Sequence, residues 1–127
     1  MNGIWMIILF FFIFQMYEMQ SVQSTFALRG DADTDCFGQS VAVDLSINVM
    51  VIGAAGCDAT VAGYVRLYNL SDFSLILQIS ASSSGGQFGG GVAISQNVLA
   101  IGSATERGNG GQLDFYFINY NAKSVNF

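Results

Sequence analysis

The most restrictive feature of this sequence is a set of segments that occurs twice in the same order. Three segments of the first half return in the second half: FGQSVAV (37–43) as FGGGVAI (88–94), VMVIGAA (49–55) as VLAIGSA (98–104), and GYVRLY (63–68) as GQLDFY (111–116). The spacing is 51 residues from Phe37 to Phe88 and 49 residues from Gly53 to Gly102. The chain therefore contains two units of about fifty residues, and any fold must accommodate both in similar ways.

The pattern of each unit predicts a series of short strands. The first unit contains four β-branched or alternating apolar runs separated by polar turns, namely 41–43, 49–52, 64–68 and 75–79. The second unit supplies three such runs, and the tail 123–127 is short for a fourth. Four short antiparallel strands per repeat are typical of a β-propeller blade. The sequence thus predicts an all-β fold of two four-stranded blades, about 31–84 and 85–127, which form an incomplete propeller after an N-terminal hydrophobic helix.

The repeated motif resembles the FG-GAP repeat, in which Phe-Gly opens one strand and a Gly-Ala or Gly-Ser pair follows about fifteen residues later. The residues that carry the resemblance are Phe37, Gly38, Gly53, Ala54, Phe88, Gly89, Gly102 and Ser103, while Ala55 and Ala104 replace the proline of the family motif. The resemblance covers about residues 31–118. It implies the propeller of integrin α subunits and of many secreted or cell-surface proteins, with Phe37 and Phe88 wedged between neighbouring blades.

The acidic residues suggest a calcium site, but their spacing does not support one. An EF-hand loop that began at Asp31 would need glycine at position 36 and glutamate at position 42, where this chain has Cys36 and Ala42. The calcium loop that the resemblance implies lies between the first two strands, and there 44–48 is too short and 95–97 shorter still. We therefore expect no cofactor and no tight calcium site. A weak cation site formed by Asp33, Asp35 and Asp58 is the alternative to plain solvated turns.

The tripeptide Arg29-Gly30-Asp31 matches an adhesion motif. Glycine and aspartate are also ordinary turn residues, and a short motif of common residues arises by chance. We interpret it as part of a polar loop that leads into the first strand.

An apolar segment near the N-terminus indicates export. From Ile4 to Phe14 eleven residues carry no polar side chain, which is the length of a signal-peptide core and well short of the roughly 20 residues of a spanning helix. Val22-x-Ser24 offers a cleavage site, and a mature chain would then begin near Thr25. We expect residues 1–24 to be a signal peptide or, alternatively, a membrane anchor formed by residues 4–17. A buried core helix is the third possibility.

Charge and composition exclude several function classes. Four basic residues stand against nine acidic ones, and they are scattered, so a nucleic-acid partner is not expected. The chain has no histidine, which is the commonest general base and the commonest metal ligand. Catalysis within these residues is therefore not expected.

Two further features agree with a secretory environment. Cys36 precedes the first strand and Cys57 follows the second, and in an antiparallel hairpin those positions lie at the same end. An oxidising compartment would join them in a disulfide, and two free thiols are the alternative. Asn69-Leu70-Ser71 is an N-glycosylation sequon, which marks Asn69 as a candidate attachment site.

These observations predict a non-catalytic secreted or cell-surface module for adhesion or ligand binding, with an unknown protein or glycan ligand. The alternatives are a fragment of a propeller-bearing secreted enzyme or a truncated piece with no independent function. Two units cannot close a propeller ring, which needs four to eight. We therefore expect either further blades or self-association to cover the exposed faces.

Overall fold

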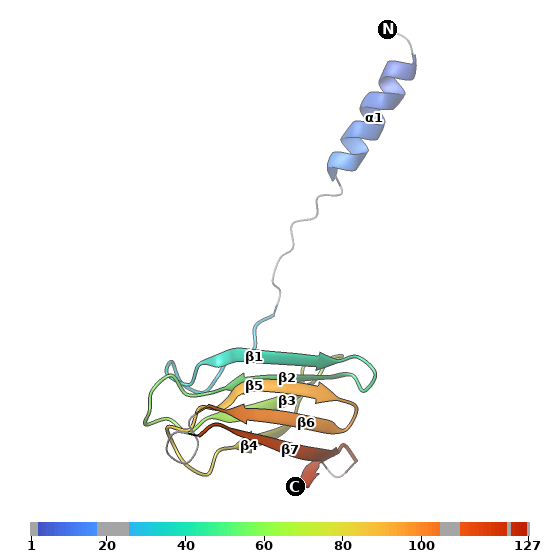
Figure 1. The fold of residues 1–127 in the computed structure, drawn as a ribbon. Coiled ribbons are helices and arrows are strands. Elements are labelled where there is room, and N and C mark those ends of the chain that lie inside the picture. The colour runs from blue at the N-terminus through green and yellow to red at the C-terminus, as the bar shows by residue number, and fades with distance from the viewer. Residues whose placement is uncertain (1–2, 18–25, 105–109, 122, 127) are drawn as a thin grey trace.

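The structure is a computed structural model, and it describes residues 3–17, 26–104, 110–121 and 123–126. It contains one helix and eight strands, which Figure 1 labels in chain order. Their bounds are α1 Gly3–Tyr17, β1 Phe37–Asp44, β2 Val49–Ala54, β3 Tyr64–Asn69, β4 Leu75–Ser80, β5 Phe88–Ser95, β6 Val98–Ser103, β7 Gln112–Asn119 and β8 Ser124–Asn126. The strand region is thus divided into two units at the place that the repeat predicts.

The strands form two antiparallel sheets, and each sheet follows the order of the chain. The first sheet is β1-β2-β3-β4, and the second is β5-β6-β7 with the three-residue β8 at its edge. The all-β prediction is confirmed. The expectation that the tail is too short for a fourth strand is wrong, because Ser124 pairs with Asn119 and Asn126 with Phe117.

The two Phe-Gly segments form the same local structure. Phe37 pairs with Ala54 in the first sheet, and Phe88 pairs with Ser103 in the second. In both sheets the register then shifts before the third residue after the phenylalanine, which marks a β-bulge. The glycine inside the bulge has φ 91° at Gly38 and 89° at Gly89. A side chain disfavours this backbone conformation, which explains why glycine follows the phenylalanine in both units.

The change of offset along the repeat comes from one turn. Asp44 pairs with Val49 across a turn formed by residues 45–48, whereas Ser95 pairs with Val98 across residues 96 and 97. The second hairpin is therefore two residues shorter, and the offset falls from 51 before the turn to 49 after it. The backbone amide of Gln96 in this shorter turn donates to the Asp44 carboxylate at 2.6 Å, which ties the two sheets together at this end.

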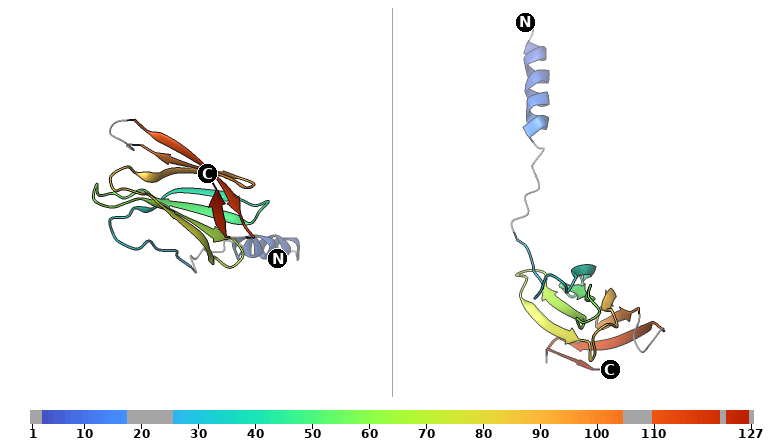
Figure 2. Two further views of the ribbon diagram at one scale, coloured as in Figure 1. Left: turned by 90° about the horizontal axis from the view of Figure 1, so that it is seen from below. Right: turned by 90° about the vertical axis from the view of Figure 1, so that its left-hand side faces the viewer.

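The core lies between the two sheets, which stack as successive layers (Figure 2). Strand β5 contacts β1, β2 and β3, so the first strand of the second sheet covers the face of the first sheet. Alternate residues of β2, β3, β6 and β7 point into this interface. The buried cluster consists of Val49, Val51, Val65, Leu67, Ile79, Phe88, Leu99, Ile101, Tyr116 and Ile118.

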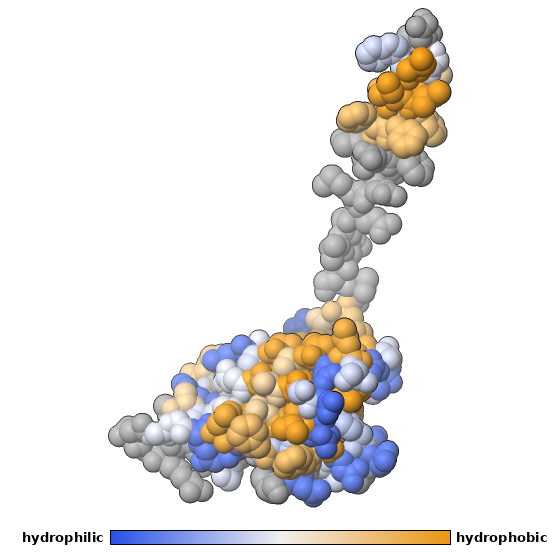
Figure 3. All heavy atoms as spheres, turned by 45° about the vertical axis from the view of Figure 1, so that its right-hand side comes forward, coloured by the Kyte–Doolittle hydropathy of each residue, from blue (hydrophilic) through white to orange (hydrophobic). Residues whose placement is uncertain are grey.

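Helix α1 carries only apolar side chains from Ile4 to Ile13, and these side chains are exposed, as Figure 3 shows. Among the described residues, no helix has both the length and the hydrophobicity that crossing a membrane requires. The predicted cleavage site at Val22-x-Ser24 and the boundary between residues 24 and 25 lie outside the described residues.

Candidate functional site

The turn before β1 is organised by the buried carboxylate of Asp35, which is only 4% exposed. Its Oδ2 accepts hydrogen bonds from the Tyr64 hydroxyl at 2.6 Å and from the amides of Asp31 at 2.7 Å and Ala32 at 3.2 Å. Its Oδ1 accepts from the amide of Phe37 at 2.9 Å. Asp35 therefore holds together the segment that leads into the first strand.

These hydrogen bonds shift the pKa values of Asp35 and Tyr64. Burial alone would raise the pKa of Asp35, but the hydrogen bonds from Tyr64 and from three backbone amides outweigh burial and lower the pKa below its ordinary value of 3.8. Burial and the same hydrogen bond to Asp35 raise the pKa of Tyr64 to about 12. Neither group changes its charge near neutral pH.

Arg66 on β3 fixes the tripeptide Arg29-Gly30-Asp31. Its guanidinium donates to the Asp31 carboxylate at 2.6 Å and lies over the rings of Tyr64, 4.6 Å from the centroid, and Phe37, at 5.7 Å. Gly30 has no room for a side chain, because an added Cβ would overlap the Asp35 carboxylate. The tripeptide thus packs as a structural turn whose aspartate is paired within the chain.

A disulfide joins Cys36 and Cys57, as the hairpin argument predicts. Two backbone bonds run beside it, from the Gly56 amide to the Asp35 carbonyl at 2.9 Å and from the Cys57 amide to the Thr34 carbonyl at 2.8 Å. The bond closes a loop with a sequence separation of 21 residues. In the chain-entropy model such a loop contributes roughly 3 kcal/mol to stability, and its presence indicates an oxidising environment.

The three candidate cation ligands do not converge. Asp35 is buried and bound by four donors, while Asp33 is exposed. The Oδ1 of Asp58 accepts from both the amide and the hydroxyl of Thr60 at 2.9 Å. Within the described part of the chain, no three residues of the types that bind metals lie close enough to hold an ion.

The sequon lies at the opposite end of the first sheet. Asn69 is the last residue of β3, and its Oδ1 accepts from the Ser71 amide at 2.8 Å and from the Asn48 side chain at 3.1 Å. Leu70 and Ser71 follow in the turn to β4, where Ser71 is exposed. The sequon is therefore at the surface of a hairpin.

The glycines of the first sheet form a slot that the second sheet fills, and we call it the filled slot. Gly53 and Gly63 are buried, and an added Cβ at these positions would overlap the carbonyl oxygens of Gly89 and Phe88. The Ser40 hydroxyl donates to the same Gly89 carbonyl at 2.7 Å. The Phe-Gly bulge of β5 is thus seated directly against backbone, which only glycine allows.

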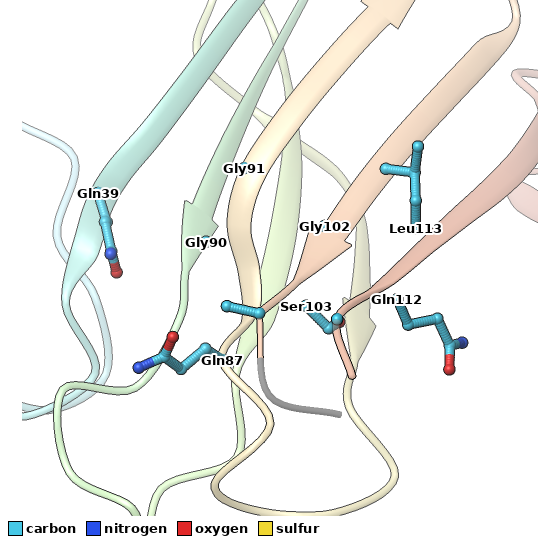
Figure 4. A pocket seen from close by; sticks show the side chains of 10 residues that line it. Gln39, Gln87, Gly90, Gly91, Gly102, Ser103, Gln112 and Leu113 are labelled. Atoms are coloured by element: carbon cyan, nitrogen blue, oxygen red, sulfur yellow. The ribbon is translucent and has the colours of Figure 1, made fainter. Parts of the chain in front are cut away.

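The second sheet contains the same slot, which no residue of the described part of the chain occupies, and we call it the open slot. By the repeat, Ser40, Gly53 and Gly63 correspond to Gly91, Gly102 and Gly111. Those three glycines line a hollow of about 480 Å³ (Figure 4). An added Cβ at Gly91 would meet nothing within 4 Å, and one at Gly102 would lie 3.6 Å from its nearest neighbour.

The face beside the open slot is apolar. Val65 and Leu67 are fully buried against the second sheet, whereas their counterparts on β7, Leu113 and Phe115, are 58% and 55% exposed. Phe117 on the same face is also exposed. Large apolar side chains gathered on one sheet face mark an interaction surface.

Ser103, which lines the hollow, is the one buried polar side chain without a hydrogen-bond partner among the described residues. The corresponding residue of the first sheet is Ala54. A buried hydroxyl with no partner costs stability, so we expect Ser103→Ala to raise the free energy of unfolding by about 1 kcal/mol. Urea denaturation measures this, with Ser95→Ala at an exposed position as the control. A loss of stability in Ser103→Ala would show that the hydroxyl has a partner.

Comparison of the chain with protein-family models, with curated proteins and with solved structures gave no match. The repeat and its geometry are therefore the basis of the functional argument. Sequence reasoning located the motif residues and the cysteine pair, but it missed the Asp35–Tyr64 pair and the open slot. The alignment of Gly63 with Gly111 is the signal that could have pointed to the slot.

Proposed function

We propose that this chain is an exported, non-catalytic binding module of the FG-GAP type, which presents its loops to a protein or glycan ligand. The observation that carries the proposal is the repeated Phe-Gly bulge, with matching φ at Gly38 and Gly89 and matching register in both sheets. The second copy is seated against the first sheet through backbone contacts, as successive propeller blades would be. The FG-GAP assignment rests on this repeat and on the residue motif.

Export is supported by three independent features. The apolar segment at the N-terminus has the length of a signal-peptide core. The Cys36–Cys57 disulfide suits an oxidising compartment. Asn69 is a partly exposed residue at the end of β3, next to the exposed Ser71 of the turn to β4. Under this proposal Asn69 is glycosylated in a eukaryotic host.

The proposal of a non-catalytic role is supported by the chemistry of the groups that the fold brings together. Asp35, in the turn before β1, and Tyr64, on β3, form a hydrogen-bonded pair of titratable groups. A general acid or base works best with a pKa near the working pH, and these two pKa values move away from neutrality. The hydrogen bonds of Asp35 instead hold the backbone of the turn before β1 in place.

The ligand-binding end is proposed to be the end of the first sheet that carries the turns 31–36 and 56–63. These turns are held by the disulfide and by Asp35, and they expose Asp33 and Asp58. Loops positioned on a rigid scaffold are the usual location of binding residues. The turns at the opposite end contain Asp72, which is also exposed.

The test is binding of the purified, disulfide-bonded protein to cultured cells. We expect saturable binding that unlabelled protein competes away, and a loss of at least about tenfold in affinity for a variant that combines Asp33→Lys with Asp58→Lys. Reversing two charges at a contact accounts for a change of that size. The matched control is Asp72→Lys, an exposed charge reversal at the other end, which should bind like the wild type. Absence of saturable binding, or equal loss in the control, would contradict the proposal.

A further inference from the structure

The first sheet shows what fills a slot of this kind. The Phe88–Gly89 bulge occupies the filled slot, and the Ser40 hydroxyl bonds to the Gly89 carbonyl at 2.7 Å. Val92 and Ile94, which follow on β5, pack against the core. A Phe-Gly bulge followed by alternate aliphatic residues is therefore the ligand of the slot within this molecule.

The chain carries a second bulge of the same kind, and this one occupies no slot among the residues that the structure describes. Gly38 has φ 91°, within two degrees of Gly89, and a Cβ added there would meet nothing within 4 Å. Val41 and Val43, the counterparts of Val92 and Ile94, are 54% and 48% exposed. One surface of the molecule thus presents the free bulge, and another presents the open slot.

We propose that two copies of this chain associate head to tail, with the Phe37–Gly38 bulge of one copy seated in the open slot of the other. The interface between the two sheets within one chain supplies the geometry. The carbonyl of Gly38 would lie between Gly91 and Gly102, and Val41 and Val43 would cover Leu113 and Phe115. This inference rests on the repeat geometry, and it holds or fails independently of the proposed ligand.

A contact of this kind joins two different surfaces, so a pair keeps a free bulge on one copy and an open slot on the other. Such an interface closes into a ring if the rotation permits and otherwise extends into a chain. We therefore expect concentration-dependent oligomers of the full chain, measured by sedimentation in a mild detergent that solubilises α1.

Two substitutions at the open slot change association in opposite directions. Gly102→Ala has room in a single copy, where the nearest atom lies 3.6 Å away, but the same methyl group at Gly53 would overlap the seated Gly89 carbonyl. We expect it to weaken association about a hundredfold. Gly91→Ser restores the hydroxyl that Ser40 provides in the filled slot, and it should tighten association about fivefold. Circular dichroism should show that both variants keep the wild-type fold.

A mixing experiment distinguishes head-to-tail pairing from a symmetric contact. A chain with Val41→Asp and Val43→Asp cannot dock its bulge but has an intact open slot. A chain with Gly102→Ala has an intact bulge but a blocked slot. Each should be monomeric alone, and together they should form a one-to-one complex that grows no further. A monomeric wild type would overturn the proposal. Association that is unchanged in both Gly102→Ala and Gly91→Ser would also overturn it, and would assign the association to α1 or to unspecific aggregation.

Discussion

Gly53→Ala is expected to lower the free energy of unfolding by about 3 kcal/mol. The added methyl group would overlap the Gly89 carbonyl oxygen and the Ser40 hydroxyl, and the first of these is backbone that belongs to the opposite sheet. To remove this overlap the two sheets must move apart, which loosens the core and breaks the hydrogen bond from Ser40 to Gly89. The free energy comes from urea denaturation of the oxidised protein at low concentration.

The matched control for this prediction is the same substitution at the equivalent position of the other sheet. Gly102→Ala adds a methyl group at an ordinary contact distance of 3.6 Å, so its effect on stability should stay within about 0.5 kcal/mol. Equal losses at both positions would mean that glycine is required by strand geometry alone. A harmless Gly53→Ala would mean that the two sheets do not pack as closely as described.

Asp35→Asn is the second substitution with a large expected effect, about 3 kcal/mol at neutral pH. The carboxylate accepts four hydrogen bonds, and an amide in its place would direct an NH₂ group at donors that need an acceptor. Asp33→Asn, an exposed change in the same turn, is the control and should alter stability by less than about 0.5 kcal/mol.

The effect of Asp35→Asn also depends on pH in a direction that the hydrogen bonds determine. Because the pKa of Asp35 is lower in the folded chain, its contribution to stability is complete above the ordinary value of 3.8 and disappears as the pH falls through the folded value. The difference between wild type and variant should therefore shrink in acid. Urea titrations at a series of pH values measure this difference, and a difference that is constant from neutral pH into acid would contradict the role assigned to the carboxylate.

The sequence predicts the strands well because they repeat. Two copies of one pattern with different surface residues identify the positions that the fold requires, and Phe37 and Phe88 open β1 and β5 as expected. The cysteine pairing follows from the antiparallel hairpin, which brings the residue before β1 and the residues after β2 to the same end. The short β8 was missed because three residues carry no pattern of their own, and its place is decided by pairing with β7.

The site was harder to predict because its contacts join residues that are far apart in the sequence. Asp35 and Tyr64 are 29 residues apart, and nothing in the local pattern separates Asp35 from its exposed neighbour Asp33. The phenylalanines illustrate the same limit, since Phe88 is buried by the first sheet while Phe37 is only partly covered. Identical motifs differ in burial because only Phe88 lies on a strand that packs against the face of the other sheet.

The disulfide described above also determines how mechanical load would pass through the molecule. Tension applied through the segment before Cys36 first meets the contacts of Asp31 and Asp35 with β3. Beyond them it reaches Cys36 and crosses the covalent bond to Cys57, so residues 37–56 lie in a closed loop that carries no force. The first hairpin, with the Phe37–Gly38 bulge, is thereby shielded from being peeled off the sheet when the N-terminal end is pulled.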